Sequence, residues 1–295
     1  MNVDLSAAAA FMATHARVLD RRRFELLTDR TDTAAVLAAL DGYRNPDGGY
    51  GWGLEPDLRS PESQPGAALH AFEVFEDIAP ATSAHATALC DWLESVSLPG
   101  GGLPFALPLT AEAGTAPWWK GADPTVPALQ ITSVTAAAAW HVAAHDPAVA
   151  AHPWLERATR YCLDAIEAID QAPSAYVLAF AVHFLDSAHD SHPEAVDLLR
   201  RLAAYVPADG RVRVEGGTED EALHPLDFAP YPDLPSRDLF APKVIDADLD
   251  RLAALQQDDG GWIVDYATIS PAGSLDWRGH TTVGAVDTLR RNGRI

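Results

Sequence analysis

One loop pattern recurs along the chain and limits the folds open to it. Four segments share the order Leu, three residues, a variable residue, three residues, Gly, one residue, and then an apolar or aromatic residue. They are Leu40/Arg44/Gly48/Tyr50, Leu93/Ser97/Gly101/Leu103, Leu202/Val206/Gly210/Val212 and Leu252/Gln256/Gly260/Trp262. Their glycines are 53, 109 and 50 residues apart, so the middle interval is close to two of the others. We interpret the chain as about five helix-pair repeats preceded by an N-terminal helix.

Alanine-rich segments with a period near 3.6 residues separate these loops, and alanine has the highest helix propensity. The segments predicted to be helical are 5–20, 33–43, 64–78, 81–97, 129–145, 153–170, 174–188, 193–206, 247–257 and 280–292. Arg211–Glu215 is a candidate for a short strand. The glycine of each loop can take the left-handed conformation that follows a helix end. The sequence therefore predicts an all-α protein.

The predicted helices are of two kinds, and their alternation indicates how they are arranged. Segment 128–140 is almost uncharged, whereas 154–170 carries six charged residues along one face. Helices that are apolar all round are buried, and amphipathic helices face water. We expect an inner ring of helices inside an outer ring, an (α/α)6 toroid that residues 1–295 form as a single domain. An open solenoid of the TPR or HEAT type is the competing repeat architecture.

Charge and cysteine content exclude several classes of function. The chain has 21 Lys and Arg against 42 Asp and Glu, a formal net charge of −21, so we expect no nucleic-acid partner. The run Arg21–Arg23 we interpret as a solvated helix face. Cys90 and Cys162 are too few for a disulfide framework, and no window has the roughly 18 apolar residues of a membrane span. We expect a soluble cytoplasmic protein without an integral membrane segment, with at most transient membrane contact through an apolar patch.

The last of the four loops reads Leu-x3-Gln-x3-Gly-x-Trp from Leu252 to Trp262, and it resembles the QW motif of the terpenoid cyclase/prenyltransferase superfamily. The loops Asp47–Trp52 and Pro99–Phe105 resemble degenerate copies, so the resemblance covers about residues 33–292. In that superfamily the Gln and Trp tie outer helices together, so the motif is structural. The resemblance implies a toroid whose central cavity accepts isoprenoid chains. It implies, as a function, a class II-like terpenoid or meroterpenoid cyclase, an isomerase or lyase that protonates its substrate.

Protonation of an alkene requires a carboxylic acid that keeps its proton at neutral pH, which burial and a nearby like charge favour. Class II cyclases carry this acid in a DxDD motif, which is absent here, and Asp246–Asp250 we interpret as acids at a helix start. We place the candidate proton donors in loops that lead into inner helices. They are Glu55, Asp57, Asp233 and Asp238, with Asp123 and Asp276 in similar segments. The competing interpretation of each is a helix cap or a charge paired with an arginine.

Aromatic rings can line the cavity and stabilise a carbocation through the ring face. The candidate substrate-binding residues are Phe105, Trp118, Trp119, Trp140, Tyr231, Trp277 and His280, with core packing as the alternative for each aromatic ring. His280 lies in a segment that resembles the one carrying a zinc-binding histidine in protein prenyltransferases. No Asp and Cys partners match, so we expect no metal, no cofactor and a hydrogen-bonded His280. His141 and His145 are spaced as i and i+4 without a third ligand in sequence reach, and we expect a structural role for them.

Two other functions stay open from the sequence. One is a non-catalytic toroid that binds a lipid or a protein partner, which the missing DxDD motif favours. The other is an α/α-barrel carbohydrate-active enzyme with paired carboxylates and a sugar-stacking aromatic residue. A dry aromatic pocket would indicate the isoprenoid function, and a polar cleft would indicate the carbohydrate function.

Overall fold

The computed structural model describes residues 3–295, which fall into two compact units. Unit 1 consists of the two ends of the chain, Met1–Ala39 and Ala203–Ile295, and unit 2 is the continuous stretch Leu40–Leu202. Both units are helical. In the described part of the chain, β-structure is limited to a few isolated bridges and one antiparallel pair in unit 1, formed by β1 (Val212–Arg213) and β2 (Ala222–Leu223). The prediction of an all-α protein is confirmed.

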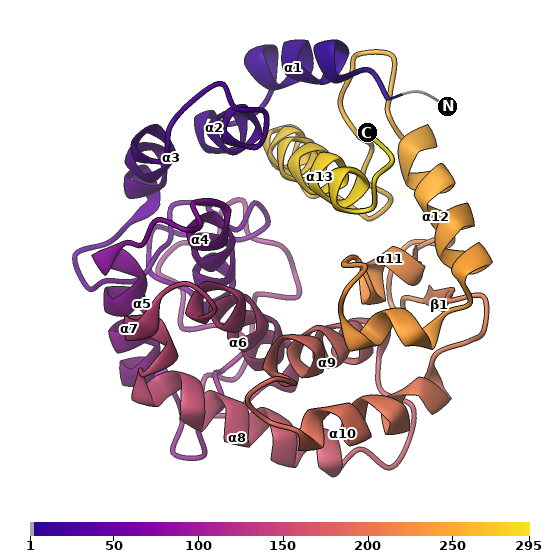
Figure 1. Cartoon of the computed structure of the whole chain (residues 1–295). Helices are drawn as coiled ribbons and strands as arrows, with labels where there is room; N and C mark the ends of the chain where they lie inside the picture. Colours follow the sequence, from indigo (N-terminus) through magenta and orange to yellow (C-terminus); the bar gives the residue numbers. More distant parts are fainter. Residues whose placement is uncertain (1–2) are drawn as a thin grey trace. The chain divides into compact units, whose positions relative to one another are not determined.

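Unit 2 is built around three neighbouring helices. Its helical elements are η1 (Asp41–Tyr43), α4 (Pro65–Asp77), α5 (Ala84–Val96), α6 (Leu129–Ala143), α7 (Pro147–Ala150), α8 (Pro153–Glu167), α9 (Ala175–Ala188) and α10 (Glu194–Leu202). Helix α6 packs between α4 and α9, and Figure 1 shows these three side by side. The buried alanines Ala136–Ala139 of α6 allow this close approach. Helix α8 exposes the charged face expected for it and buries Trp154 and Leu155.

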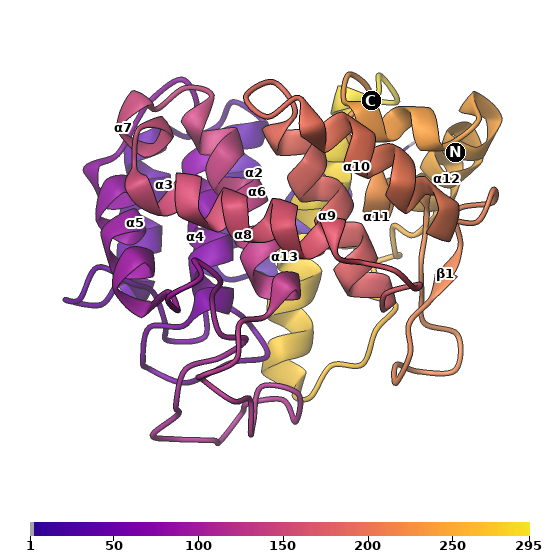
Figure 2. The same ribbon diagram turned by 90° about the horizontal axis from the view of Figure 1, so that it is seen from below.

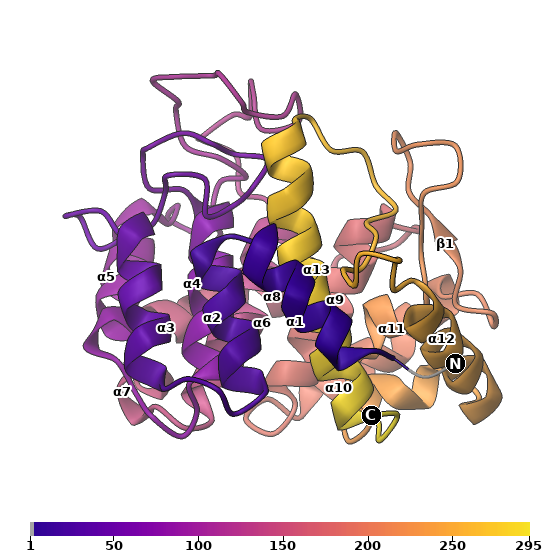
Figure 3. The same ribbon diagram turned by 90° about the horizontal axis from the view of Figure 1, so that it is seen from above.

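Unit 1 joins the first helices of the chain to the last ones. Its elements are α1 (Leu5–Thr14), α2 (Val18–Leu27), α3 (Thr33–Leu40, with its last residue in unit 2), η2 (Ala203–Tyr205), α11 (Pro225–Phe228), η3 (Pro235–Leu239), α12 (Pro242–Ala254) and α13 (Pro271–Arg291). Helix α13 packs along α2 and contacts α12, and the pairing of α2 with α13 is visible in Figure 3. The core of this unit includes Phe11, Phe24 and Trp262, each at most 1% exposed.

Three local expectations are wrong in unit 1. Residues 18–27 form α2, and Arg23 is only 8% exposed in it rather than solvated. The hydrophobic pattern does not indicate this helix, because its buried face includes a charged residue. Asp20 is buried, and its carboxylate pairs with Arg17 at 2.7 Å. Helix α13 begins at Pro271 instead of residue 280, so Asp276 lies inside the helix. The acids Asp246–Asp250 lie in the middle of α12 rather than at its start.

The four repeat loops share one backbone conformation. Their glycines all have positive φ, which is +92° at Gly48, +90° at Gly101, +70° at Gly210 and +93° at Gly260. In all four loops the glycine N–H donates to the carbonyl of the residue three positions earlier. In the loops of Gly48, Gly101 and Gly260 the N–H of that earlier residue donates in turn to the carbonyl of the residue after the glycine, whereas Pro207 in the Gly210 loop has no N–H. The sequence repeat is therefore a repeat of one hydrogen-bonded turn.

Three of these turns also pack against the backbone of another helix. A Cβ placed on Gly48 would lie 2.9 Å from the carbonyl oxygen of Ala88 in α5. The same atom on Gly101 would lie 2.6 Å from the Arg157 carbonyl oxygen in α8, and on Gly260 it would lie 2.1 Å from that of Ala7 in α1. Each of these distances is below what a real Cβ tolerates, so a side chain at these glycines requires the backbone to shift.

The Gln of the last loop connects the end of α12 to the start of α1 within unit 1, and the Trp closes the loop back onto α12. The Gln256 side chain accepts a hydrogen bond from the Asp4 N–H and donates one to the Asp4 carbonyl, both at 2.8 Å. Trp262 is fully buried, and its Nε1 donates to the Leu252 carbonyl at 2.8 Å. Two distant parts of the sequence are thus held together by one amide side chain.

The long loops of unit 2 gather at one end of its central helices. Figure 2 shows the loops that precede α4 and α6 extending beyond the N-terminal ends of these helices. None of the helices within residues 3–295 combines the length and the apolar character needed to cross a membrane.

Candidate functional site

Side-chain hydrogen bonds fix the loop that leads into α4. Asn45 donates through Nδ2 to the Pro61 carbonyl at 2.9 Å, and its Oδ1 accepts a hydrogen bond from Trp52 Nε1 at 2.8 Å. These contacts span the loop from its start to its end. Between them the chain turns inward and buries Glu55 and Asp57, which are 6% and 3% exposed.

A buried histidine between two glutamates forms the centre of the candidate site. His70 in α4 lies with Nε2 3.0 Å from Oε2 of Glu55 and with Nδ1 3.1 Å from Oε2 of Glu73. Glu55 comes from the loop, and Glu73 lies one turn after His70 in the same helix. Because both ring nitrogens face carboxylate oxygens, the arrangement suits an imidazolium that donates from each nitrogen. We call these three residues the Glu–His–Glu cluster.

The charge of the cluster follows from its geometry. Burial by itself lowers the pKa of His70, but attraction and hydrogen bonding to Glu73 and Glu55 outweigh burial and raise this pKa to about 9. The imidazole therefore holds a proton at neutral pH.

We expect the protein to lose stability as the pH rises from about 7 through 9. The pKa of His70 is about 9 in the folded chain against an ordinary value of 6.5, so its stabilising contribution is complete below pH 6.5 and is lost as the pH passes 9. The full effect is about 3 kcal/mol. Urea unfolding between pH 6 and 10 measures it, with His70→Gln as the control. Equal pH dependence in the two proteins would contradict this assignment.

Aromatic rings from the second loop lie next to the cluster. The rings of Phe105 and Trp119 stack with their centroids 4.5 Å apart and their planes at 18°. A Cβ on Gly66, in the first turn of α4, would lie 3.0 Å from the Trp119 ring and 3.6 Å from Cγ of Glu55, so both side chains lie close to this turn. Trp119 is 7% exposed, and among residues 3–295 no acceptor pairs with its buried indole N–H. That N–H is a donor for which a ligand can supply the acceptor.

Hydrogen bonds join the two loops around Asp57. Its backbone N–H donates to Glu55 Oε1 at 3.0 Å, and its carbonyl accepts from the Ala116 N–H at 2.8 Å. The Gln64 side chain adds two hydrogen bonds to the backbone of Leu107, at 2.8 and 3.2 Å. One end of α4 therefore collects four of the sequence-predicted site residues, namely Glu55, Asp57, Phe105 and Trp119.

Two other predicted residues of unit 2 have different surroundings. Trp118 lies in the same loop as Trp119, but its side chain is 48% exposed. Trp140 in α6 donates through Nε1 to Thr159 in α8 at 3.0 Å, and its ring meets His192 edge-on at 5.7 Å. These contacts assign Trp140 to packing between helices.

The remaining predicted residues belong to unit 1. Asp233 and Asp238 are exposed there. The guanidinium of Arg291 lies over the Tyr231 ring, 4.8 Å from its centroid. Trp277 and His280 lie edge to face at 5.6 Å within α13.

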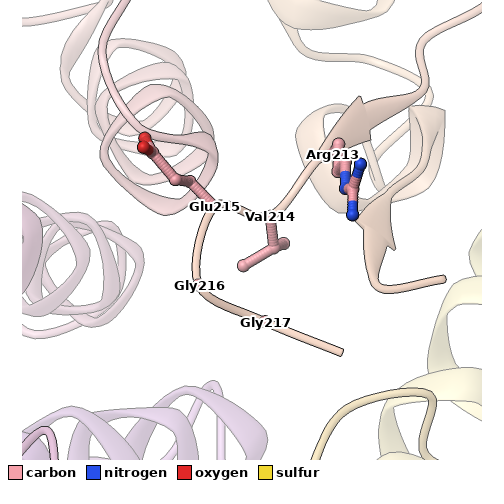
Figure 4. A pocket seen from close by; sticks show the side chains of 5 residues that line it. All are labelled: Arg213, Val214, Glu215, Gly216 and Gly217. Atoms are coloured by element: carbon pink, nitrogen blue, oxygen red, sulfur yellow. The ribbon is translucent and has the colours of Figure 1, made fainter. Parts of the chain in front are cut away.

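An open pocket in unit 1 lies at the turn after β1. Figure 4 shows the residues that line it, which are Arg213, Val214, Glu215, Gly216 and Gly217. None of these five residues belongs to the predicted site. Its two charged side chains, Arg213 and Glu215, point apart in Figure 4, so the pocket offers no focused acid–base group.

The sequence analysis missed His70 and Glu73, which complete the cluster. A histidine followed three residues later by a glutamate places both side chains on one helix face, and this spacing was the available signal. The structure thus defines a helical protein with a buried acid–base cluster beside stacked aromatic rings. A scan of the sequence against protein-family models finds no match, and a search of curated proteins finds none.

Proposed function

We propose that the chain closes into an α/α toroid of the terpenoid cyclase/prenyltransferase kind and cyclises an isoprenoid by protonating it. The packing of the repeat loops supports the toroid. The glycine turns of the first and second repeats lie on α5 and α8, and the turn of the last repeat lies on α1. This last contact returns the chain to its first helix, as a closed ring requires and an open solenoid does not.

The buried Glu–His–Glu cluster beside the Phe105–Trp119 stack is the observation that carries the chemistry. Asp57 is the proposed proton donor, because it is a carboxylic acid only 3% exposed in the loop that also carries Glu55. Its O–H proton goes to one alkene carbon, and the π pair forms the new C–H bond. The other carbon becomes a cation, a second alkene attacks it, and a final proton loss to a base discharges the product cation.

Neighbouring groups favour the cationic intermediate. The carboxyl groups of Glu55 and Glu73 lie on the two sides of His70, and fixed carboxylates attract a cation without reorganisation. Each aromatic face adds up to about 2 kcal/mol when desolvated. The indole N–H of Trp119, which finds no acceptor among residues 3–295, suits an acceptor oxygen at one end of an otherwise apolar substrate. A prenyl chain with an oxygen-bearing head group has this combination.

Replacing Asp57 by asparagine is expected to lower cyclisation at least about 100-fold, because the amide has no acidic proton to give. Purified protein is incubated with prenyl diphosphates, prenylated phenols and squalene in a chelating buffer, and cyclic products are measured by gas chromatography and mass spectrometry. Asp123→Asn is the matched control, since Asp123 is an exposed acid on the second loop and should keep full activity. Wild-type rates in Asp57→Asn would rule out this donor.

Identification of any co-purifying molecule separates this proposal from its rivals. Native mass spectrometry of the freshly purified protein should show a bound apolar compound. The mass that this compound adds to the protein should match a polyprenyl compound. A bound isoprenoid that no incubation converts would indicate a non-catalytic binding protein. Cleavage of an oligosaccharide that fails in Glu55→Gln would instead indicate the carbohydrate-active function.

A further inference from the structure

Three helices of unit 2 bring a glutamate, a histidine and a serine into one hydrogen-bonded series. Glu76 lies near the end of α4, His141 near the end of α6 and Ser187 near the end of α9. Nδ1 of His141 lies 3.0 Å from Oε2 of Glu76, and Nε2 of His141 lies 2.9 Å from Oγ of Ser187. Because α6 packs between α4 and α9 (Figure 1), the three side chains meet across two helix interfaces.

This order of groups is the one that activates a serine hydroxyl. A carboxylate on Nδ1 holds the imidazole in the tautomer whose Nε2 is an acceptor, and Nε2 then removes the hydroxyl proton. The spacing of His141 and His145 on one helix led us to expect a structural role for both. The partners of His141 come from two other helices, which this spacing does not reveal.

The hydroxyl of Ser187 has one proton and two acceptors within hydrogen-bond distance. Besides His141 Nε2, the His183 carbonyl oxygen, one turn earlier in α9, lies 2.7 Å from Oγ. A serine that only satisfies its own helix donates to such a carbonyl. Moving the proton to the His141 side needs only rotation of the hydroxyl hydrogen, since Oγ is already in place for both bonds. An activated Ser187 must populate that second orientation.

The series is open to solvent. The side chains of Glu76 and His141 are 22% and 23% exposed, and Ser187 is half-buried. Attack on a small electrophile requires that it reach Oγ of Ser187 from this partly exposed side. Glu76 lies three residues after Glu73 in α4, and the series shares no residue with the Glu–His–Glu cluster.

We infer that Ser187 is a nucleophile for small carboxylic esters, with His141 as its general base and Glu76 positioning His141. Oγ forms a bond to the ester carbonyl carbon while its proton moves to Nε2 of His141. The C–O bond to the leaving alcohol then breaks, and that proton passes to the alcohol oxygen. Water attacks the acyl-serine by the same sequence and releases the carboxylic acid.

A fluorophosphonate probe tests this inference directly, because it phosphonylates activated serines. We expect one adduct, mapped to Ser187 by peptide mass spectrometry, and its loss in Ser187→Ala. Labelling of His141→Gln should be at least about 100-fold slower, as expected on removal of a general base. Labelling of Glu76→Gln should be at least about tenfold slower, and Glu76→Asp should recover part of the rate because it keeps the carboxylate. Hydrolysis of 4-nitrophenyl acetate should follow the same order.

Two controls separate this activity from folding and from the proposed cyclase. Ser97 donates to the Leu93 carbonyl four residues earlier, as Ser187 does to His183, so Ser97→Ala should leave labelling unchanged. Asp57→Asn should also label normally. Thermal unfolding checks that each variant is folded. Absence of a Ser187 adduct in the wild type, or equal labelling rates in folded His141→Gln, would overturn the inference.

Discussion

Replacing His70 with leucine is expected to lower the free energy of unfolding by about 3–5 kcal/mol. The imidazolium lies between Glu55 and Glu73 in a site where it is 4% exposed, and leucine removes the positive charge that both carboxylates face. A buried charge that loses its partner costs far more than the pair itself contributes, because its desolvation is no longer compensated. The Glu–His–Glu cluster is therefore a sensitive point of unit 2.

Urea unfolding at pH 6, where His70 is charged, measures this effect. His85→Leu is the matched control, because His85 pairs with Asp41 at 3.2 Å while both side chains are at least a third exposed. The His85→Leu substitution should lower the free energy of unfolding by less than about 1 kcal/mol. The triple variant Glu55→Gln, His70→Leu, Glu73→Gln should recover part of the stability, since no uncompensated charge is left. Similar losses in His70→Leu and His85→Leu would contradict the burial and pairing described for His70.

Replacing Gly260 with alanine is expected to destabilise unit 1 by more than about 3 kcal/mol. Two causes act together at this position. The φ of +93° is strained for any residue with a side chain, and the added Cβ would lie 2.1 Å from the Ala7 carbonyl oxygen and 2.2 Å from its carbon. Both atoms are backbone, so α1 has to move away from the turn.

Gly216→Ala separates these two causes. Gly216 has a φ of +80°, but an added Cβ would meet nothing within 4 Å, so only the backbone strain of about 1–2 kcal/mol is expected. Denaturant unfolding of both variants gives the difference that the contact with α1 contributes. If the two substitutions cost the same, the close approach of Gly260 to Ala7 is not present in solution.

Periodicity was a good guide to most helices because it reports on the local burial of one face. The predicted segment 129–145 became α6 (Leu129–Ala143), and 64–78 became α4 (Pro65–Asp77). The loop repeat also predicted a left-handed glycine in each turn, which the structure confirms. The pattern did not predict helix α2, because part of the buried face of this helix is charged. Asp20 and Arg23 are among the residues that it buries. Ion pairs can replace apolar contacts there, and a hydrophobic pattern does not detect them.

The candidate site was only partly predictable. Position before a predicted inner helix was enough to nominate Glu55 and Asp57, because loop acids at helix starts are a local feature. His70 was not nominated, since its pairing with Glu55 depends on how the loop folds back over α4. The stacking of Phe105 on Trp119 likewise depends on the path of a long loop. Side-chain partners that are distant in sequence leave no periodic signal.

The side-chain amide of Gln256, just after α12, is hydrogen-bonded to the backbone at the start of α1. This pairing of the two ends of the chain has a consequence for biosynthesis. A nascent chain leaves the ribosome from its N-terminus, so α1 and α2 emerge long before α12 and α13 exist. Until α12 and α13 emerge, the apolar faces of α1 and α2 lack these partners, whereas all of Leu40–Leu202, a continuous stretch, has already been made. In a chain that stops before α12, α1 and α2 would lack these partners. A chaperone or a protease could then recognise the exposed apolar faces of α1 and α2.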